Sequence, residues 1–151
     1  MDESIKVENK QQVNFKLIEV EKIKFFENDP AEIGFNNTKV DTKIHTELKI
    51  NMKQGIIGII LEIAFSLKEK PEINLFGIKT EHTYKIQEIS KIVKKITNNG
   101  FNIPDQFLAI LISVAYSGTR GMLSVLVTNK KYKKIILPIV DPKKLLPQKS
   151  N

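Results

Sequence analysis

The side chains of this chain that could do chemistry are few, and none of them is arranged for catalysis. His45 and His82 are its only histidines and it has no cysteine, which excludes thiolate nucleophiles and cysteine-ligated metals. Both histidines fall in strand-like segments. They are either ordinary strand residues or, if they meet across a sheet, a weak metal site that lacks further ligands. Ser117 follows Tyr116 and so lacks the Gly-x-Ser-x-Gly turn of serine hydrolases. We therefore expect no enzyme, no metal and no cofactor.

Phosphate binding is the other chemistry to consider, because the formal net charge is +7. Arg120 is the single arginine among 24 basic residues, although arginine is the usual bidentate reader of phosphates and bases. The glycine pair in residues 55–58 lacks the spacing and the Lys-Ser/Thr ending of a nucleotide loop. The charge excess is greatest late in the chain, in a lysine cluster: Lys130, Lys131, Lys133 and Lys134. This cluster is either a phosphate-binding patch or a solvated loop. We expect the second, so nucleic acid is not an expected partner.

Arg120 lies about one helical turn after Tyr116, in a segment that also contains Gly118 and Gly121. The arginine either contacts a bound polypeptide or partner, or forms a buried or interfacial pair that fixes its helix against a neighbouring subunit. We expect the second, because the planar donors of arginine suit interface ion pairs. Glycines weaken a helix but permit close approach of another backbone. These four residues are therefore predicted to be interface or structural positions.

The N-terminal third predicts one strand followed by a crossover. Residues 1–12 are polar and acidic, which predicts a flexible lead-in and no signal peptide, and so a cytoplasmic protein. Residues 13–25 alternate like a strand with a bulge or register change near Glu21. Asn-Asp-Pro at residues 28–30 ends that strand, and residues 31–38 form the crossover.

Three more strands and two helices follow. Residues 40–52 alternate without a break, and residues 56–67 and 73–84 predict two further strands. Their short connections favour antiparallel pairing. Helical spacing over residues 86–96 and 102–126 predicts two helices, with Asn102 as the cap of the second. The expected fold is α+β, a four-stranded antiparallel meander sheet followed by two helices.

The predicted domain spans residues 13–146 and is followed by a flexible tail at 147–151. The strand at 56–67 begins apolar on both faces, and the longer helix is apolar on two sides. Exposing these apolar surfaces to water would be unfavourable in free energy, so we expect homo-oligomerisation through the sheet and the long helix. The longest apolar run falls short of the ~20 residues that span a bilayer, so no membrane insertion is expected.

The order of these elements resembles the SecB family of export and holdase chaperones. The Asn/Asp-Pro crossover with its apolar residues at 25–35 and the Leu-Phe-Gly-Ile stretch at 75–78 are similar to features of that family. So are Tyr116 and Arg120 on the long helix and the apolar Pro-containing closing segment at 136–142. The resemblance covers nearly the whole chain.

The resemblance implies an ATP-independent holdase for unfolded or aggregation-prone polypeptides, assembled as a homotetramer that is a dimer of dimers. Clients would be bound for export through SecA or for a dedicated partner such as a toxin-antitoxin protein. Export SecB proteins are typically acidic and this chain is basic, so both routes stay open. The alternative is a small basic module that binds nucleic acid or an acidic partner through the lysine cluster.

The client groove is expected at the crossover and the adjoining aromatic residues: Phe26, Ile33, Phe35, Leu75, Phe76 and Phe101. Leu75 and Phe101 can equally be ordinary core residues. Phe35 lies in a polar loop and is hard to explain as core. We therefore expect its replacement by Ala to weaken client binding with little change in the thermal midpoint.

Overall fold

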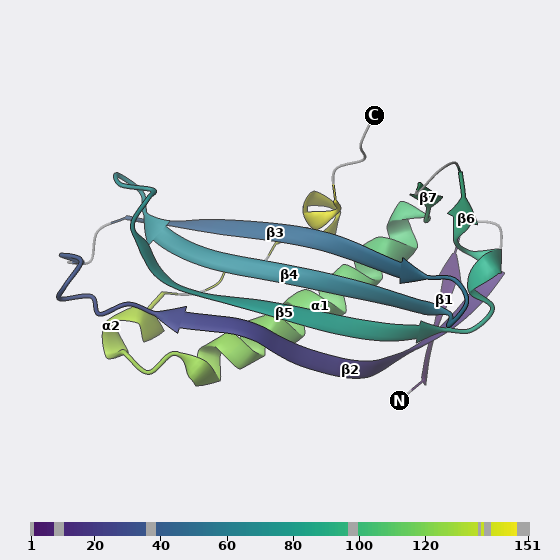
Figure 1. Ribbon diagram of the computed structural model, residues 1–151, viewed down its shortest axis with the longest axis horizontal. Helices are drawn as coiled ribbons and strands as arrows, with labels where there is room; N and C mark the ends of the chain where they lie inside the picture. Colours follow the sequence, from purple (N-terminus) through teal and green to yellow (C-terminus); the bar gives the residue numbers. More distant parts are fainter. Residues whose placement is uncertain are drawn as a thin grey trace.

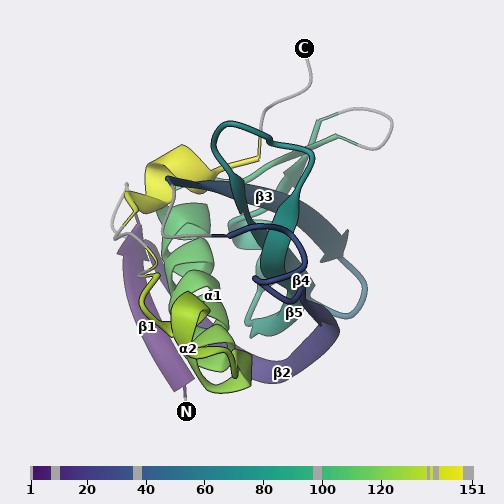
Figure 2. The ribbon, with the colours of Figure 1, turned by 90° about the vertical axis from the view of Figure 1, so that its left-hand side faces the viewer.

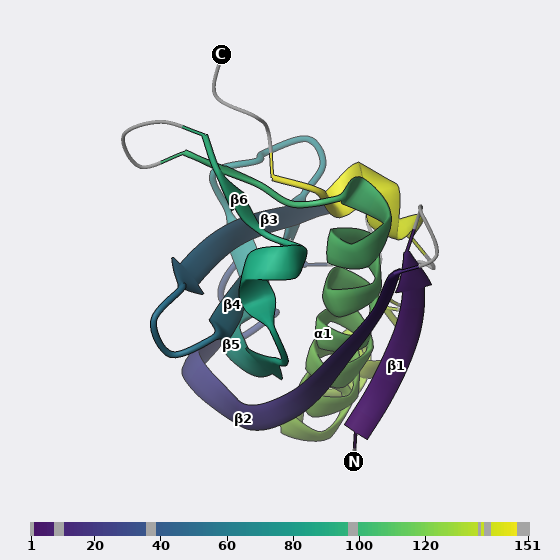
Figure 3. The ribbon, with the colours of Figure 1, turned by 90° about the vertical axis from the view of Figure 1, so that its right-hand side faces the viewer.

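A five-stranded antiparallel sheet curls around one long helix in the computed structural model of the protein (Figures 1, 2 and 3). The structure describes residues 2–7, 11–35, 39–96, 100–135, 137 and 140–147. The strands of the sheet are β1 (Asp2–Val7), β2 (Gln11–Glu27), β3 (Val40–Asn51), β4 (Ile56–Leu67) and β5 (Asn74–Ile86). Their order across the sheet is β1-β2-β5-β4-β3. The α+β class and the antiparallel sheet are thus confirmed.

The remaining elements lie against the sheet or at its ends. They are the 3₁₀ turn η1 (Ile89–Lys91), the short strands β6 (Lys94–Lys95) and β7 (Phe101–Asn102), the helices α1 (Asp105–Leu126) and α2 (Lys130–Lys133), and the 3₁₀ turn η2 (Pro142–Leu145). Figure 3 shows α1 inside the curl of the sheet, with β1 on one side and β3 to β5 on the other.

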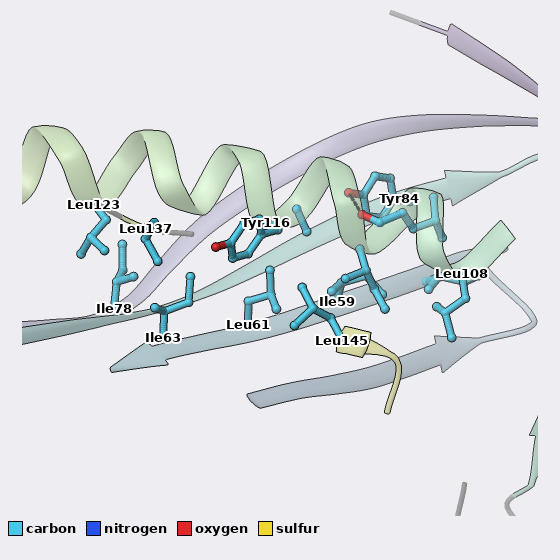
Figure 4. Packing of buried hydrophobic residues seen from close by; sticks show 14 of the residues in the cluster. Ile59, Leu61, Ile63, Ile78, Tyr84, Leu108, Tyr116, Leu123, Leu137 and Leu145 are labelled. Atoms are coloured by element: carbon cyan, nitrogen blue, oxygen red, sulfur yellow. Dashed lines mark hydrogen bonds between the residues drawn. The ribbon is translucent and has the colours of Figure 1, made fainter. Parts of the chain in front are cut away.

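Strands β3, β4 and β5 form the predicted meander. Residue partners such as Ile50 with Ile57 and Ile63 with Ile78 keep the apolar side chains of neighbouring strands on the same face. The tight turn between β3 and β4 requires Gly55, whose φ of 67° lies in the left-handed region that favours glycine. Figure 4 shows side chains of β4 pointing toward α1.

Strand β2 does not continue the meander, which corrects one part of the predicted sheet. It pairs with β5, so the four long strands run in the order β2-β5-β4-β3 and the crossover carries the chain to the far edge. This is a Greek-key order. Register shifts between Leu17 and Glu19 and between Lys22 and Lys24 flank the predicted irregularity near Glu21.

The predicted flexible lead-in is wrong for residues 2–7, which form β1. This strand pairs antiparallel with residues 11–16 of β2, and the Ser4 hydroxyl donates a hydrogen bond to Asn14 Oδ1. Its short, largely polar sequence gave no clear strand signal, whereas its backbone pairing with β2 defines it as a strand. Residues 8–10 lie outside the described part of the chain, as do residues 148–151 of the predicted tail.

The predicted helix over residues 86–96 is also wrong. Ile86 ends β5, and only the three residues of η1 are helical before β6. Glu88 adopts a left-handed conformation with φ 53°, which an α-helix does not permit. Ile89 and Val93 are buried, so their spacing correctly signalled burial. The β-branched side chains of this segment fit extended backbone as well as helix.

Helix α1 carries the predicted apolar stripe into the core. Leu111, Ile112 and Ala115 are fully buried, and the Tyr84 hydroxyl of β5 donates to the Leu111 carbonyl at 2.8 Å (Figure 4). The helix begins after Pro104, and the predicted cap Asn102 lies in β7. By length and composition α1 is apolar enough to cross a membrane, a test that buried helices of soluble proteins also pass.

The outer face of β4 is covered within the single chain. Ile60 lies between Glu47 of β3 and Glu81 of β5 and is only 6% exposed. Lys49 Nζ lies 3.5 Å from Glu81 Oε1 above this face. Long charged side chains cover apolar neighbours with their stems, so this face does not by itself require a partner chain.

Candidate functional site

Three of the six predicted client-binding residues belong to the core. Phe35, Leu75 and Phe76 are each at most 5% exposed. The Phe35 ring packs against the Tyr132 ring with centroids 5.6 Å apart. The interpretation of Phe35 as an exposed crossover residue is therefore wrong, because the crossover folds onto a residue that lies far away in sequence.

The other three, Phe26, Ile33 and Phe101, are half-buried. The Phe26 ring lies over Gly77 of β5, where an added Cβ would approach Phe26 Cε1 to 2.7 Å. This contact explains the glycine in the Leu-Phe-Gly-Ile stretch. Phe101 lies in β7, at the opposite end of the sheet from α2 (Figure 1). The six residues therefore do not form one groove.

A row of aromatic rings runs beneath α2. Phe65 and Phe76 stack with centroids 4.4 Å apart, and Phe76 and Tyr132 lie 4.9 Å apart. Tyr132 is buried although lysines surround it in sequence. Its hydroxyl donates to the Asn28 carbonyl at 2.5 Å. Burial, followed by the nearby carboxylates of the β2 end and the crossover, raises the pKa of Tyr132 to about 12.

The end of β2 fixes α2 in place through one carboxylate. Glu27 accepts hydrogen bonds from the backbone N–H groups of Thr128 and Asn129, at 3.0 and 2.8 Å, and from the Thr128 hydroxyl. Asn129 in turn caps α2 by accepting from the Lys131 N–H. Sequence reasoning missed this arrangement, since neither Glu27 nor Tyr132 stands out from its neighbours.

A pocket of about 310 Å³ opens between α2, the last turns of α1 and the ends of β4 and β5. Most of its wall is apolar, including Phe65, Phe76, Leu123, Tyr132, Ile135 and Leu137. Its polar lining consists of Arg120, Ser124 and Lys133. We refer to it below as the aromatic pocket.

Arg120 is exposed at this pocket and forms no ion pair with any residue that the structure describes. Burial raises the pKa of the Tyr116 hydroxyl, and the positive charge of Arg120 opposes that shift. The predicted pairing of Arg120 within the fold is therefore absent from the described residues. Its predicted role at an interface between subunits stays a prediction.

Gly118 and Gly121 have different environments. A Cβ at Gly118 would lie 2.8 Å from His82 Nε2, whereas a Cβ at Gly121 would meet nothing within 4 Å. Gly118 thus permits close contact between α1 and β5, although the group that approaches it is the His82 side chain and not the backbone that was predicted. Gly121 instead faces open space on the outer side of α1.

The two histidines lie on opposite faces of the sheet. His45 opposes Glu62 on the outer face and is exposed, with Nε2 3.2 Å from Glu47 Oε1. His82 lies beneath α1, and neither of its ring nitrogens has a hydrogen-bond partner in the described part of the chain. Among the described residues no group of three or more potential metal ligands occurs.

Lowering the pH should destabilise the fold through His82. Burial lowers the pKa of folded His82 below its ordinary value of 6.5, so the unfolded chain binds the proton first. This contribution to stability is fully present above pH 6.5 and is lost progressively as the pH falls from 6.5 through the lower pKa of the folded state. We expect the thermal midpoint to drop between pH 7.5 and 5.5 in the wild type and in His45→Gln, but much less in His82→Leu. An equal drop in all three proteins would contradict this assignment.

Strand β2 presents apolar side chains that the fold leaves uncovered. Leu17, Ile18, Val20 and Ile23 are 36 to 49% exposed. Leu17 pairs with Tyr84 and Val20 with His82, which places both on the α1 side of the sheet. Beyond residue 16, β2 has β5 as its partner, and no strand among the described residues pairs with its other edge. We call these four residues and this edge the β2 surface.

No protein-family model matches the chain, and no curated protein matches its sequence. The site must therefore be interpreted from its own geometry.

Of the closing segment predicted at residues 136–142, residues 136, 138 and 139 lie outside the described part of the chain. Leu137 is buried against the core.

The lysine cluster surrounds α2. Lys130, Lys131, Lys133 and Lys134 are all exposed, while Tyr132 between them points inward. Lys130, Lys131 and Lys134 are thus solvated, while Lys133 also lines the aromatic pocket, which Tyr132 closes. The amines of the cluster make no ion pair within the described residues.

Proposed function

We propose that the protein is an ATP-independent holdase that binds unfolded polypeptide along the β2 surface. The observation that carries this proposal is the coincidence of exposed apolar side chains with an unpaired strand edge. An unfolded client offers the matching groups, namely apolar side chains and free backbone N–H and C=O groups. Strand addition uses both, since backbone hydrogen bonds supply affinity and alternate side chains supply selectivity.

The order of the elements supports the resemblance to SecB. The long strand β2 leads through a crossover to three meandering strands and then to a long helix. The first of the two predicted helices, over residues 86–96, is replaced by a 3₁₀ turn and a small hairpin, and the chain is basic. Delivery of clients to SecA and service to a toxin-antitoxin partner are both included in this proposal.

The outer face of α1 supports assembly with further copies. Ser117, Gly121 and Val125 are exposed and uncharged, and Val125 is 80% exposed. Small residues allow the backbone of a second helix to approach closely, and burying Val125 would be favourable. We include in the proposal a homotetramer built as a dimer of dimers through α1.

Aggregation of a chemically unfolded client should be suppressed at a stoichiometric ratio without ATP. Replacing Leu17 and Val20 together by Thr should weaken client binding by about tenfold, because two exposed apolar contacts are lost. Threonine is β-branched and suits a strand, and both positions are exposed, so the thermal midpoint should change little. Ile96→Thr, which alters a 63% exposed residue directly after β6, is the matched control. Light scattering on the same samples should give the mass of a tetramer.

Undiminished aggregation at an excess of the wild-type protein would contradict the holdase proposal. A monodisperse monomer at micromolar concentration would contradict the proposed assembly. Tight RNA or DNA binding that weakens steeply with salt, and disappears when the four clustered lysines become Gln, would favour the basic binding module instead.

A further inference from the structure

The aromatic pocket has the size and lining of a small-molecule site. Its volume of about 310 Å³ lies at the lower end of the ~300–1,000 Å³ that such sites occupy. The stacked rings of Phe65 and Phe76 form one wall, and Leu123 and Leu137 contribute aliphatic surface. A compact apolar group would bury against these side chains.

The wall of this pocket is already held in position. Tyr132 is fixed by its hydrogen bond to the Asn28 carbonyl and by the Phe35 ring packed against it. Both neighbours of Tyr132 belong to the β2 end and the crossover. A preformed wall requires little ordering when a ligand binds, which favours affinity.

The charged side chains that line the pocket are all positive. Arg120 and Lys133 contribute to the lining, no acidic side chain does, and neither cation has an ion-pair partner among the described residues. The nearby carboxylate of Glu27 is occupied by the N–H groups of Thr128 and Asn129. The pocket therefore combines an apolar interior with two unpaired positive charges.

We propose that the aromatic pocket binds a small amphiphilic carboxylate, such as a medium-chain fatty acid, as a ligand distinct from the polypeptide client. The apolar body lies between Phe65, Phe76 and Leu123, and the carboxylate pairs with Arg120 and Lys133. Arginine suits this role because its fork of donors can bind a carboxylate with two hydrogen bonds. A phosphate without an apolar body would leave the aromatic wall uncovered.

The test is calorimetric titration of the full chain with decanoate, below its micelle-forming concentration, in parallel with decanol. We expect saturable binding of one decanoate per chain and at least tenfold weaker binding of decanol, because a charge-assisted hydrogen bond is lost. Arg120→Gln should weaken decanoate binding about tenfold and leave decanol binding unchanged. Lys130→Gln, on the same short helix but outside the pocket lining, is the matched control.

A second variant tests the location. Ser124→Trp places a large side chain at the pocket from an exposed helix position, so it should abolish decanoate binding without unfolding the protein. Equal affinities for decanoate and decanol, binding that does not saturate, or full binding in Ser124→Trp would each overturn the proposal. These measurements involve no client protein, so their outcome is independent of the holdase assay.

Discussion

Replacing Phe35 by Ala should lower the free energy of unfolding by about 3–5 kcal/mol, the usual cost of truncating a buried phenylalanine. Phe35 is 5% exposed and packs on Tyr132, so its removal leaves a cavity behind the wall of the aromatic pocket. Urea unfolding followed by far-ultraviolet circular dichroism measures the change. Ile33→Ala, a half-buried position on the same crossover, should cost clearly less.

The opposite result would restore the interpretation of Phe35 as a client-binding residue. In that case Phe35→Ala would unfold at the wild-type urea concentration and bind clients more weakly. A core role for Phe35 predicts a loss of stability, whereas a client-binding role predicts a loss of client affinity. Measuring both quantities for Phe35→Ala therefore distinguishes the two roles.

Gly118→Ala should destabilise the protein by about 1–3 kcal/mol, the usual range for overpacking. The new methyl group would lie 2.8 Å from Nε2 of His82, a buried ring with little room to move. Gly121→Ala on the same helix meets nothing within 4 Å and should instead stabilise by about 0.5–1 kcal/mol, because alanine favours helix over glycine. Thermal or urea unfolding of the two variants should therefore shift in opposite directions.

A double variant identifies the cause of the Gly118 effect. His82→Ala removes the ring that the new methyl group would meet, so adding Gly118→Ala to it should cost much less than in the wild type. If the cost is the same in both backgrounds, helix α1 rather than its contact with β5 would be the source.

The sequence predicted those parts of the fold in which local pattern and burial agree. Strand β3 and helix α1 were both recognised, because strict alternation and a 3.6-residue stripe each match one structure only. Residues 86–96 fit both a helix and an extended segment, and the left-handed Glu88 decided between them. Strand β1 has only two apolar residues among its six, too short a pattern to predict its pairing with β2.

The candidate site was predictable only in part, because its contacts join distant segments. Phe76 lines the aromatic pocket as a member of the predicted set, but Tyr132 was hidden among lysines. The apolar residues of β2 were visible in the sequence. Their exposure was not, since it depends on where α1 lies relative to the far edge of the sheet.

The pairing of β2 with β5 has a consequence for synthesis on the ribosome. Phe15 pairs with Ile86 and Glu27 with Phe76, so β2 is translated long before its partner exists. Strands β3 to β5 can pair with one another through short turns. Pairing of β2 with β5 closes a much longer loop, so it has a greater entropic cost and should occur later. The nascent chain should therefore carry an unpaired apolar strand through most of translation. Its own folding would then be most vulnerable to aggregation during that interval.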